Sequence, residues 1–236
     1  MSFIITVHTN EGIIMASDSR STYSLTIPKL DGGTERIVGA HTTDTTYKTY
    51  LFNSRIGIST CGAGDVNGVP ISGFIEKFIA EKVNADVSVE DTAKSINEFF
   101  SKVSSGINVN FIVAGYNKDE LFPKVYRVVI ANQSVIVQDT SAPGAVWDGE
   151  TVTLSKLVQP VGVHQPNGQY IDLPSYGINF QFFTLQDAID FANYAVDVTI
   201  KTMAFENCAK TVGGPIDILA IKPDKAFWIA RKELHA

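Results

Sequence analysis

The sequence predicts an α+β protein in which helices cover both outer faces of two stacked antiparallel sheets, a four-layer α/β/β/α sandwich. Short apolar segments recur in pairs joined by brief turns, a pattern typical of antiparallel hairpins. Apolar residues with helical spacing recur at 74–103 and again at 185–203, and each stretch is long enough to cover a sheet. The order is strands, two helices, strands, helices and strands, which fits helix layers placed outside paired sheets.

The first hairpin is expected at the N-terminus. Residues 3–8 and 12–17 are nearly continuous in apolar content and are separated by the turn signal Thr9-Asn10-Glu11-Gly12. Continuous rather than alternating apolar content indicates strands that are covered on both faces. Residues 21–46 follow, rich in Ser, Thr, Gly and Asp, and they predict an exposed excursion.

The remaining elements are assigned in chain order, within one domain that spans residues 1–236. Strands are expected at 47–53, 56–61, 109–116, 124–131, 134–138, 216–221 and 226–230. Helices are expected around 74–83, after the capping residue Ser88, from 147 to 157, and after the capping residue Thr184. Residues 159–180, rich in proline and glycine, are expected to form a loop.

The composition argues against several classes of protein. The formal net charge is −6, and no Lys/Arg cluster could neutralise a row of phosphates, so a nucleic-acid partner is not expected. No apolar run reaches the roughly 18 residues of a membrane span, and no basic leader precedes the first strand. The two cysteines and four histidines show no metal-ligand or triad spacing. We therefore expect a cytoplasmic protein with two free thiols, no membrane association, no metal and no cofactor.

Four separated motifs resemble one known family. They are Ser2 after the initiator Met1, the segment from Gly12 that ends in Asp18-Ser19-Arg20, Lys48, and Cys61-Gly62-Ala63-Gly64-Asp65. Together they resemble the proteasome β-subunit and its bacterial self-compartmentalising relatives, which are N-terminal nucleophile (Ntn) hydrolases. The intervals from Ser2 to Asp18 and from Lys48 to Gly62 match the family. The chain is longer than typical members within about 21–46, which is read as an insertion.

The resemblance implies hydrolysis of peptide or amide bonds through Ser2, once removal of Met1 has freed its α-amine. The Ser2 hydroxyl would be the nucleophile, and the amine, with an ordinary pKa of roughly 7.7–8.0, would be the general base. Lys48 would lie beside Ser2 and Asp18 would hold Lys48. The backbone N–H of Gly62, at a helix N-terminus, would stabilise the oxyanion. Asp18→Asn or Lys48→Ala is expected to slow the reaction without unfolding the protein.

Structural roles compete with these catalytic ones. Lys48 is also compatible with a solvated lysine at a strand start, and Gly62 with a tight strand-to-helix turn. Arg20 is expected to make only a structural ion pair with Asp18, and Asp65 and Asp148 to be turn or cap residues.

Two segments depart from the family pattern and leave three functions open. Active members carry an Asp and a Ser before a late glycine turn, whereas residues 207–214 read Asn-Cys-Ala-Lys-Thr-Val-Gly-Gly. The family's Gly-Ser-Gly segment is represented only by Trp147-Asp148-Gly149-Glu150. The first function is a proteasome-like peptidase, assembled as a homo-oligomer, with an ATPase as a candidate partner. The second is an amidase acting on a small molecule, and the third is a non-catalytic assembly or binding module.

Overall fold

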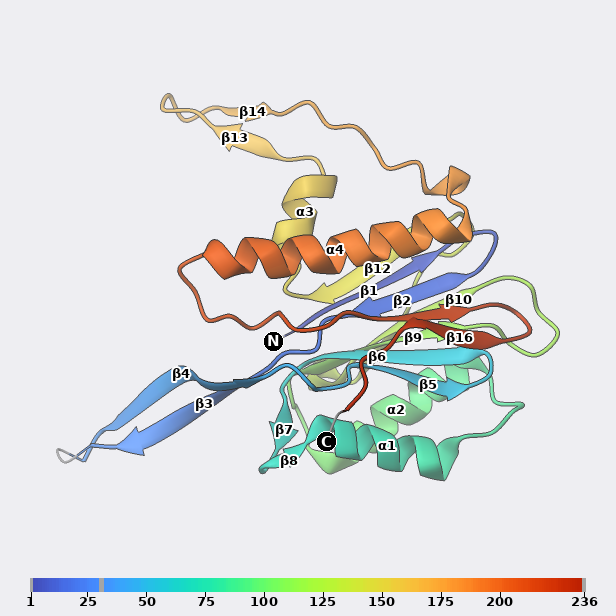
Figure 1. Cartoon of the computed structure of the whole chain (residues 1–236), viewed down its shortest axis with the longest axis horizontal. Coiled ribbons are helices and arrows are strands. Elements are labelled where there is room, and N and C mark those ends of the chain that lie inside the picture. The colour runs from blue at the N-terminus through green and yellow to red at the C-terminus, as the bar shows by residue number, and fades with distance from the viewer. Residues whose placement is uncertain (1, 30–31, 235–236) are drawn as a thin grey trace.

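Two stacked antiparallel sheets form the centre of the computed structural model, which describes residues 2–29 and 32–234 (Figure 1). The first sheet has the order β12 (Gly144–Gly149), β1 (Phe3–His8), β2 (Ile13–Ser17), β15 (Asp217–Ile221) and β16 (Ala226–Ala230). The second has the order β11 (Ser134–Val137), β10 (Lys124–Val129), β9 (Val109–Gly115), β6 (Ile56–Gly62) and β5 (Thr49–Asn53).

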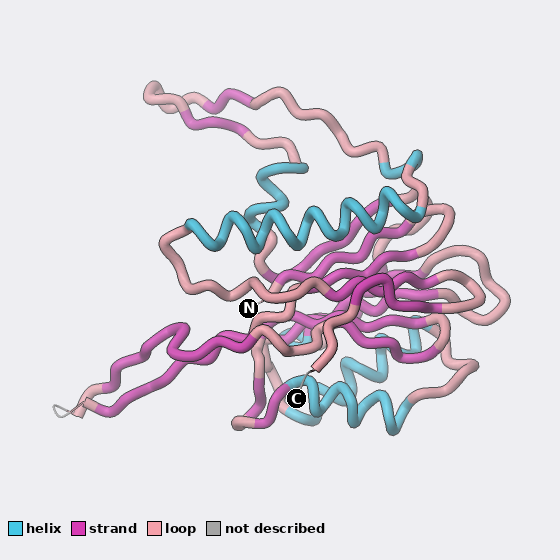
Figure 2. Tube along the Cα trace, in the orientation of Figure 1, coloured by secondary structure: helices cyan, strands magenta, loops and turns pink. Residues whose placement is uncertain are grey.

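Helices form the two outer layers, as Figure 2 shows in cyan. Helices α3 (Val152–Val158) and α4 (Leu185–Phe205) lie over the first sheet. Helices α1 (Ile71–Lys82) and α2 (Val89–Val103) lie over the second sheet. The predicted four-layer α/β/β/α arrangement is confirmed. None of the helices in the described ranges has both the length and the apolar character needed to cross a membrane.

Strand β1 shows why its apolar residues are continuous. Phe3, Ile5 and Val7 are fully buried in the apolar layer that separates the first sheet from α4. Ile4, which points to the opposite face, is fully buried in the layer between the two sheets. A third apolar layer separates the second sheet from α1 and α2. A strand in the middle of such a stack has no solvent-facing side, which accounts for the absence of alternation.

Both predicted helix caps are present. The Ser88 side chain accepts a hydrogen bond from the Asp91 backbone N–H at 3.0 Å, at the start of α2. Thr184 and Asp187 form a reciprocal capping box at the start of α4. Each cap satisfies backbone donors that the first helical turn leaves free.

The predicted excursion is exposed but regular. Residues 21–46 contain β3 (Ser21–Pro28) and β4 (Thr34–Thr43), which pair as a hairpin that projects from the body (Figure 1). Likewise, the loop expected at 159–180 contains the short hairpin of β13 (Gly162–His164) and β14 (Tyr170–Asp172). Both were missed because an exposed ribbon lacks the burial pattern that identifies strands in the core.

One sheet strand was assigned wrongly as the start of a helix. Residues 144–149 form β12, in which Trp147 pairs with Ile5 of β1, and α3 begins only at Val152. Gly149, with φ at +91°, ends the strand and allows the chain to turn towards the helix. The pairing with β1 is distant in sequence, so local spacing did not reveal it.

Candidate functional site

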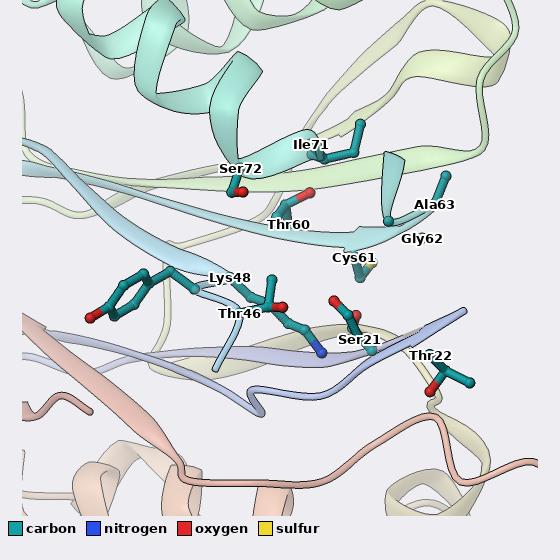
Figure 3. A pocket seen from close by; sticks show the side chains of 13 residues that line it. Ser21, Thr22, Thr46, Lys48, Thr60, Cys61, Gly62, Ala63, Ile71 and Ser72 are labelled. Atoms are coloured by element: carbon teal, nitrogen blue, oxygen red, sulfur yellow. The ribbon is translucent and has the colours of Figure 1, made fainter. Parts of the chain in front are cut away.

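A small pocket lies between the two sheets, at the base of the β3–β4 hairpin (Figure 3). Ser2, Lys48 and Gly62 line it, together with Ser21 and Thr46. Figure 3 shows the Lys48 side chain extending into this space towards Ser21. Three of the four residues expected at the site therefore share one pocket, although they come from distant parts of the chain.

Asp18, the fourth, lies directly behind Lys48 and is fully buried. The Lys48 ammonium donates to both of its carboxylate oxygens at 2.8 Å. Backbone N–H groups of Phe3, Arg20 and Gly213 also donate to the carboxylate, each at 3.0 Å. The negative charge is thus held by one cation and three fixed backbone dipoles, which compensates for its burial.

Lys48 is not a solvated lysine, because only 4% of its side chain is exposed. Its third hydrogen bond goes to the Arg20 carbonyl at 2.5 Å, so Asp18 and Arg20 together use all three ammonium donors. Burial lowers the pKa of Lys48 below the ordinary lysine value, although the charge of Asp18 opposes this effect. The Lys48 ammonium is therefore fixed by Asp18 and Arg20 at the wall of the pocket that Ser2 also lines.

Gly62 ends β6 in a conformation that requires glycine. Its φ is +110°, and a Cβ at this position would lie 2.3 Å from the Asn108 carbonyl oxygen. The expectation that Gly62 stands at a helix N-terminus is wrong. A small hairpin, β7 (Asp65–Val66) and β8 (Val69–Pro70), intervenes, and α1 begins at Ile71. The start of α1 still reaches the pocket wall through Ile71.

Ser2 is almost completely buried, with 6% of its surface exposed. Its carbonyl oxygen accepts a hydrogen bond from the Glu150 backbone N–H at 2.8 Å. Gly149 packs closely on the same oxygen, since a Cβ there would lie 1.8 Å away. The end of β12 thus fixes the backbone of the candidate nucleophile. Met1, whose removal the mechanism requires, lies outside the described residues.

One side-chain pair, on the residue whose backbone N–H binds the Ser2 carbonyl, escaped prediction from the sequence. The Thr211 hydroxyl, which is buried, donates to the Glu150 carboxylate at 3.1 Å. These residues lie in the two segments that depart from the family pattern, so the departures themselves were the available signal. Glu150 links this pair to Ser2 through its backbone.

Arg20 does not pair with the Asp18 carboxylate through its guanidinium group. Instead, its Nε and Nη2 donate to the two carboxylate oxygens of Asp44, each at 2.7 Å. This bidentate contact holds the pKa of Asp44 below its usual range. The structural role expected for Arg20 therefore holds, with a different partner.

Asp148 was expected to be a turn or cap residue, but it lies within β12 and is buried. Its carboxylate forms an ion pair with the Arg127 guanidinium at 2.8 Å and accepts a hydrogen bond from Asn110 at 3.0 Å. Asp65 begins β7, and its carboxylate caps the turn to β8 by accepting the Gly68 backbone N–H at 3.0 Å, which agrees with the expected turn or cap role.

The cysteines and the possible metal ligands bear on alternative kinds of site. Cys61 and Cys208 are both free, and burial raises the pKa of the Cys61 thiol, which opposes formation of a thiolate. Within 2–29 and 32–234, no cluster of three or more His, Cys, Asp or Glu side chains is arranged to hold a metal ion.

The architecture defined by these layers is that of a proteasome-like fold. The chain is similar to the Anbu (Gly-1) mutant from Hyphomicrobium sp. strain MC1, with a TM-score of 0.63 and 15% sequence identity, over 98% of this chain and 86% of that chain. It is also similar to Anbu from the same strain, with a TM-score of 0.60 and 14% identity, over 98% and 88%. At such identities the likeness shows the fold alone. No protein-family model matches the chain. No curated protein sequence matches it either.

Proposed function

We propose that this protein is a proteasome-like hydrolase of peptide or amide bonds, with Ser2 as its N-terminal nucleophile after Met1 has been removed. One observation carries the proposal. Ser2, the buried Asp18–Lys48 ion pair and the positive-φ turn at Gly62 converge on a single pocket. A buried ion pair is costly to maintain for stability alone, so its place beside a hydroxyl favours a functional role.

The reaction would proceed in two steps. The Ser2 α-amine takes the hydroxyl proton as Oγ attacks the substrate carbonyl, and the backbone N–H of Gly62 stabilises the oxyanion. Collapse of this intermediate breaks the amide bond, transfers the proton to the leaving amine and leaves an ester on Ser2. Water, deprotonated by the same amine, then hydrolyses the ester and restores the hydroxyl.

The charge of Lys48 assists both steps. A fixed positive charge beside Ser2 favours the neutral, proton-accepting form of the α-amine and stabilises negative charge that develops on Oγ. Asp18 positions Lys48 for this role. In the same proposal, Glu150 and Thr211 supply the polar support for the amine that other family members obtain from the late Asp and Ser.

Labelling of the purified protein tests the proposal. Intact-mass measurement should show loss of Met1, and a β-lactone that acylates N-terminal nucleophiles should add one equivalent to Ser2. Ser2→Ala should abolish labelling. Ser21→Ala, which removes another hydroxyl from the same pocket, should leave it unchanged. A protein that retains Met1 and takes up no label would exclude the proposal and favour the non-catalytic assembly module.

A small-molecule amidase is the second candidate. The base of the β3–β4 hairpin contributes the small polar side chains of Ser21 and Thr22 to the pocket wall. Parallel screens of peptide amides and small amides would separate the two activities. The peptidase also requires a self-compartmentalised homo-oligomer, measurable by sedimentation, and co-purification of an ATPase would support it.

A further inference from the structure

A second buried ion pair lies near the candidate site, and the proposed mechanism does not use it. Asp217, at the start of β15, and Lys232, which follows β16, form an ion pair in which the side chains are 0% and 4% exposed. The Lys232 backbone N–H also donates to the Asp217 carboxylate at 2.8 Å. Asp217 pairs in register with Ser17, the residue before Asp18.

Lys232 is also bound to Tyr47, the residue immediately before Lys48. The Tyr47 hydroxyl donates to the Lys232 carbonyl at 3.1 Å, and the Lys232 ammonium lies 4.3 Å from the centre of the Tyr47 ring. The Arg231 guanidinium lies 5.0 Å from the centre of the same ring. A hydrogen bond and two cation–π contacts therefore hold this one side chain against the C-terminal segment.

The contacts of Tyr47 help to fix the position of the next residue, Lys48. The Tyr50 hydroxyl donates to the Tyr47 carbonyl at 2.7 Å, and the Thr60 backbone N–H donates to the Lys48 carbonyl at 2.9 Å. The chain at 47–48 is thus held by the second sheet on one side and by Lys232 on the other. Loss of the Lys232 ammonium would weaken the second of these supports and leave the first intact.

We propose that residues 231–234 are a structural part of the candidate site, in which Lys232 and Tyr47 are positioning residues that fix Lys48 beside Ser2. The catalytic meaning of this inference rests on the proposed function, whereas the positioning of the chain at 47–48 does not. The inference adds the C-terminal segment to a site that the sequence assigned to residues 2–62.

Two variants test the inference. Asp217→Asn combined with Lys232→Met removes both charges, so that no unpaired charge stays buried. Tyr47→Phe removes only the hydrogen bond to Lys232. Lys225→Met is the matched control, because Lys225 is an exposed lysine whose ammonium lies 5.8 Å from an aromatic ring at the β15–β16 turn.

The first measurement is the rate and affinity of β-lactone labelling. In the double variant the maximal labelling rate should fall about 10-fold, because a displaced charge weakens the chemical step, while the concentration for half-maximal rate changes less than about 2-fold. Tyr47→Phe should show a smaller decrease, and the control should match the native protein.

The second measurement does not need activity. Hydrogen exchange at the Thr60 amide, which is bonded to the Lys48 carbonyl, should become about 10-fold faster in the double variant and faster to a lesser degree in Tyr47→Phe. Unchanged exchange and labelling in either folded variant would overturn the inference. If the native protein is not labelled at all, the proposed function fails and exchange alone decides the positioning role. If the double variant does not fold, Tyr47→Phe decides it.

Discussion

Replacement of Asp18 by Asn is expected to destabilise the protein strongly, in addition to removing activity. The carboxylate accepts five hydrogen bonds, two of them from the Lys48 ammonium. An amide would present N–H donors to backbone donors such as that of Gly213, and would leave the ammonium without a counter-charge. The hydrogen-bond geometry therefore changes the expectation, drawn from the sequence, that Asp18→Asn slows the reaction without unfolding the protein.

The magnitude follows from the burial of the pair. Removing one partner of a buried ion pair costs about 3–5 kcal/mol, and Asp18→Asn should fall in this range because Lys48 stays charged and buried. Lys48→Met should cost less, about 2–3 kcal/mol, because the carboxylate keeps three backbone donors. Combining the two substitutions removes the unpaired charge. The double variant should therefore be more stable, by about 2 kcal/mol, than the sum of the single effects implies.

Urea denaturation followed by the fluorescence of Trp147 and Trp228 measures these free energies of unfolding. Asp44→Asn is the control, because Asp44 and Arg20 form a partly exposed pair whose loss should cost less than about 1 kcal/mol. Two results would contradict this reasoning. One is a cost of Asp18→Asn no greater than that of the control, and the other is simple additivity of the effects of Asp18→Asn and Lys48→Met on the free energy of unfolding. Either result would mean that the two buried side chains do not stabilise each other as an ion pair.

Three further predictions concern backbone strain, pH and the support of the amine. Gly62→Ala should cost about 1–3 kcal/mol and reduce labelling, because its φ is positive and a Cβ would overlap a backbone oxygen, whereas Gly64→Ala, in open space, should change neither. Burial lowers the pKa of His8 below 6.5, so as the pH drops His8 is protonated in the unfolded chain before it is protonated in the folded protein. Thermal stability should therefore fall as the pH drops below 6.5. His8→Phe should remove this part of the pH dependence, and melting curves between pH 5 and 7 would contradict the argument if both slopes were equal. Glu150→Gln should shift the rising limb of the labelling pH profile to lower pH, since a carboxylate favours the protonated amine, and Thr211→Ser should preserve the native profile.

The layers of the fold were predictable because burial leaves a local pattern. Phe3 to Val7 are continuous in apolar content since sheet and helix cover both faces, and Thr184 shows a capping sequence. Strand β12 was not predictable in this way. Its identity depends on pairing with β1, more than a hundred residues earlier, and no local feature of Trp147 or Asp148 encodes that partner.

In the candidate site, too, some residues were predictable from the sequence and others were not. Ser2, Asp18, Lys48 and Gly62 were expected from the family resemblance, whose intervals they match, and the structure places them at or directly behind one pocket. Their intervals carry information because β1, β2, β5 and β6 have fixed lengths and a fixed register between them.

Contacts between segments far apart in the sequence could not be predicted from a fixed interval between residues. Thr211 meets Glu150 only because the chain leaving α4 returns beside the end of β12 on its way into β15. Lys232 meets Tyr47 only because the segment after β16 crosses to the start of β5. Glu150, whose backbone N–H binds the Ser2 carbonyl, is held by the Thr211 side chain. Tyr47, which precedes Lys48, is held by the Lys232 carbonyl. Both partners come from the last quarter of the chain. In the proposed mechanism the N-terminal strands supply the reacting groups, and the C-terminal segments contact the residues next to those groups. Truncation near the C-terminus should therefore impair the site before it disrupts the sheets.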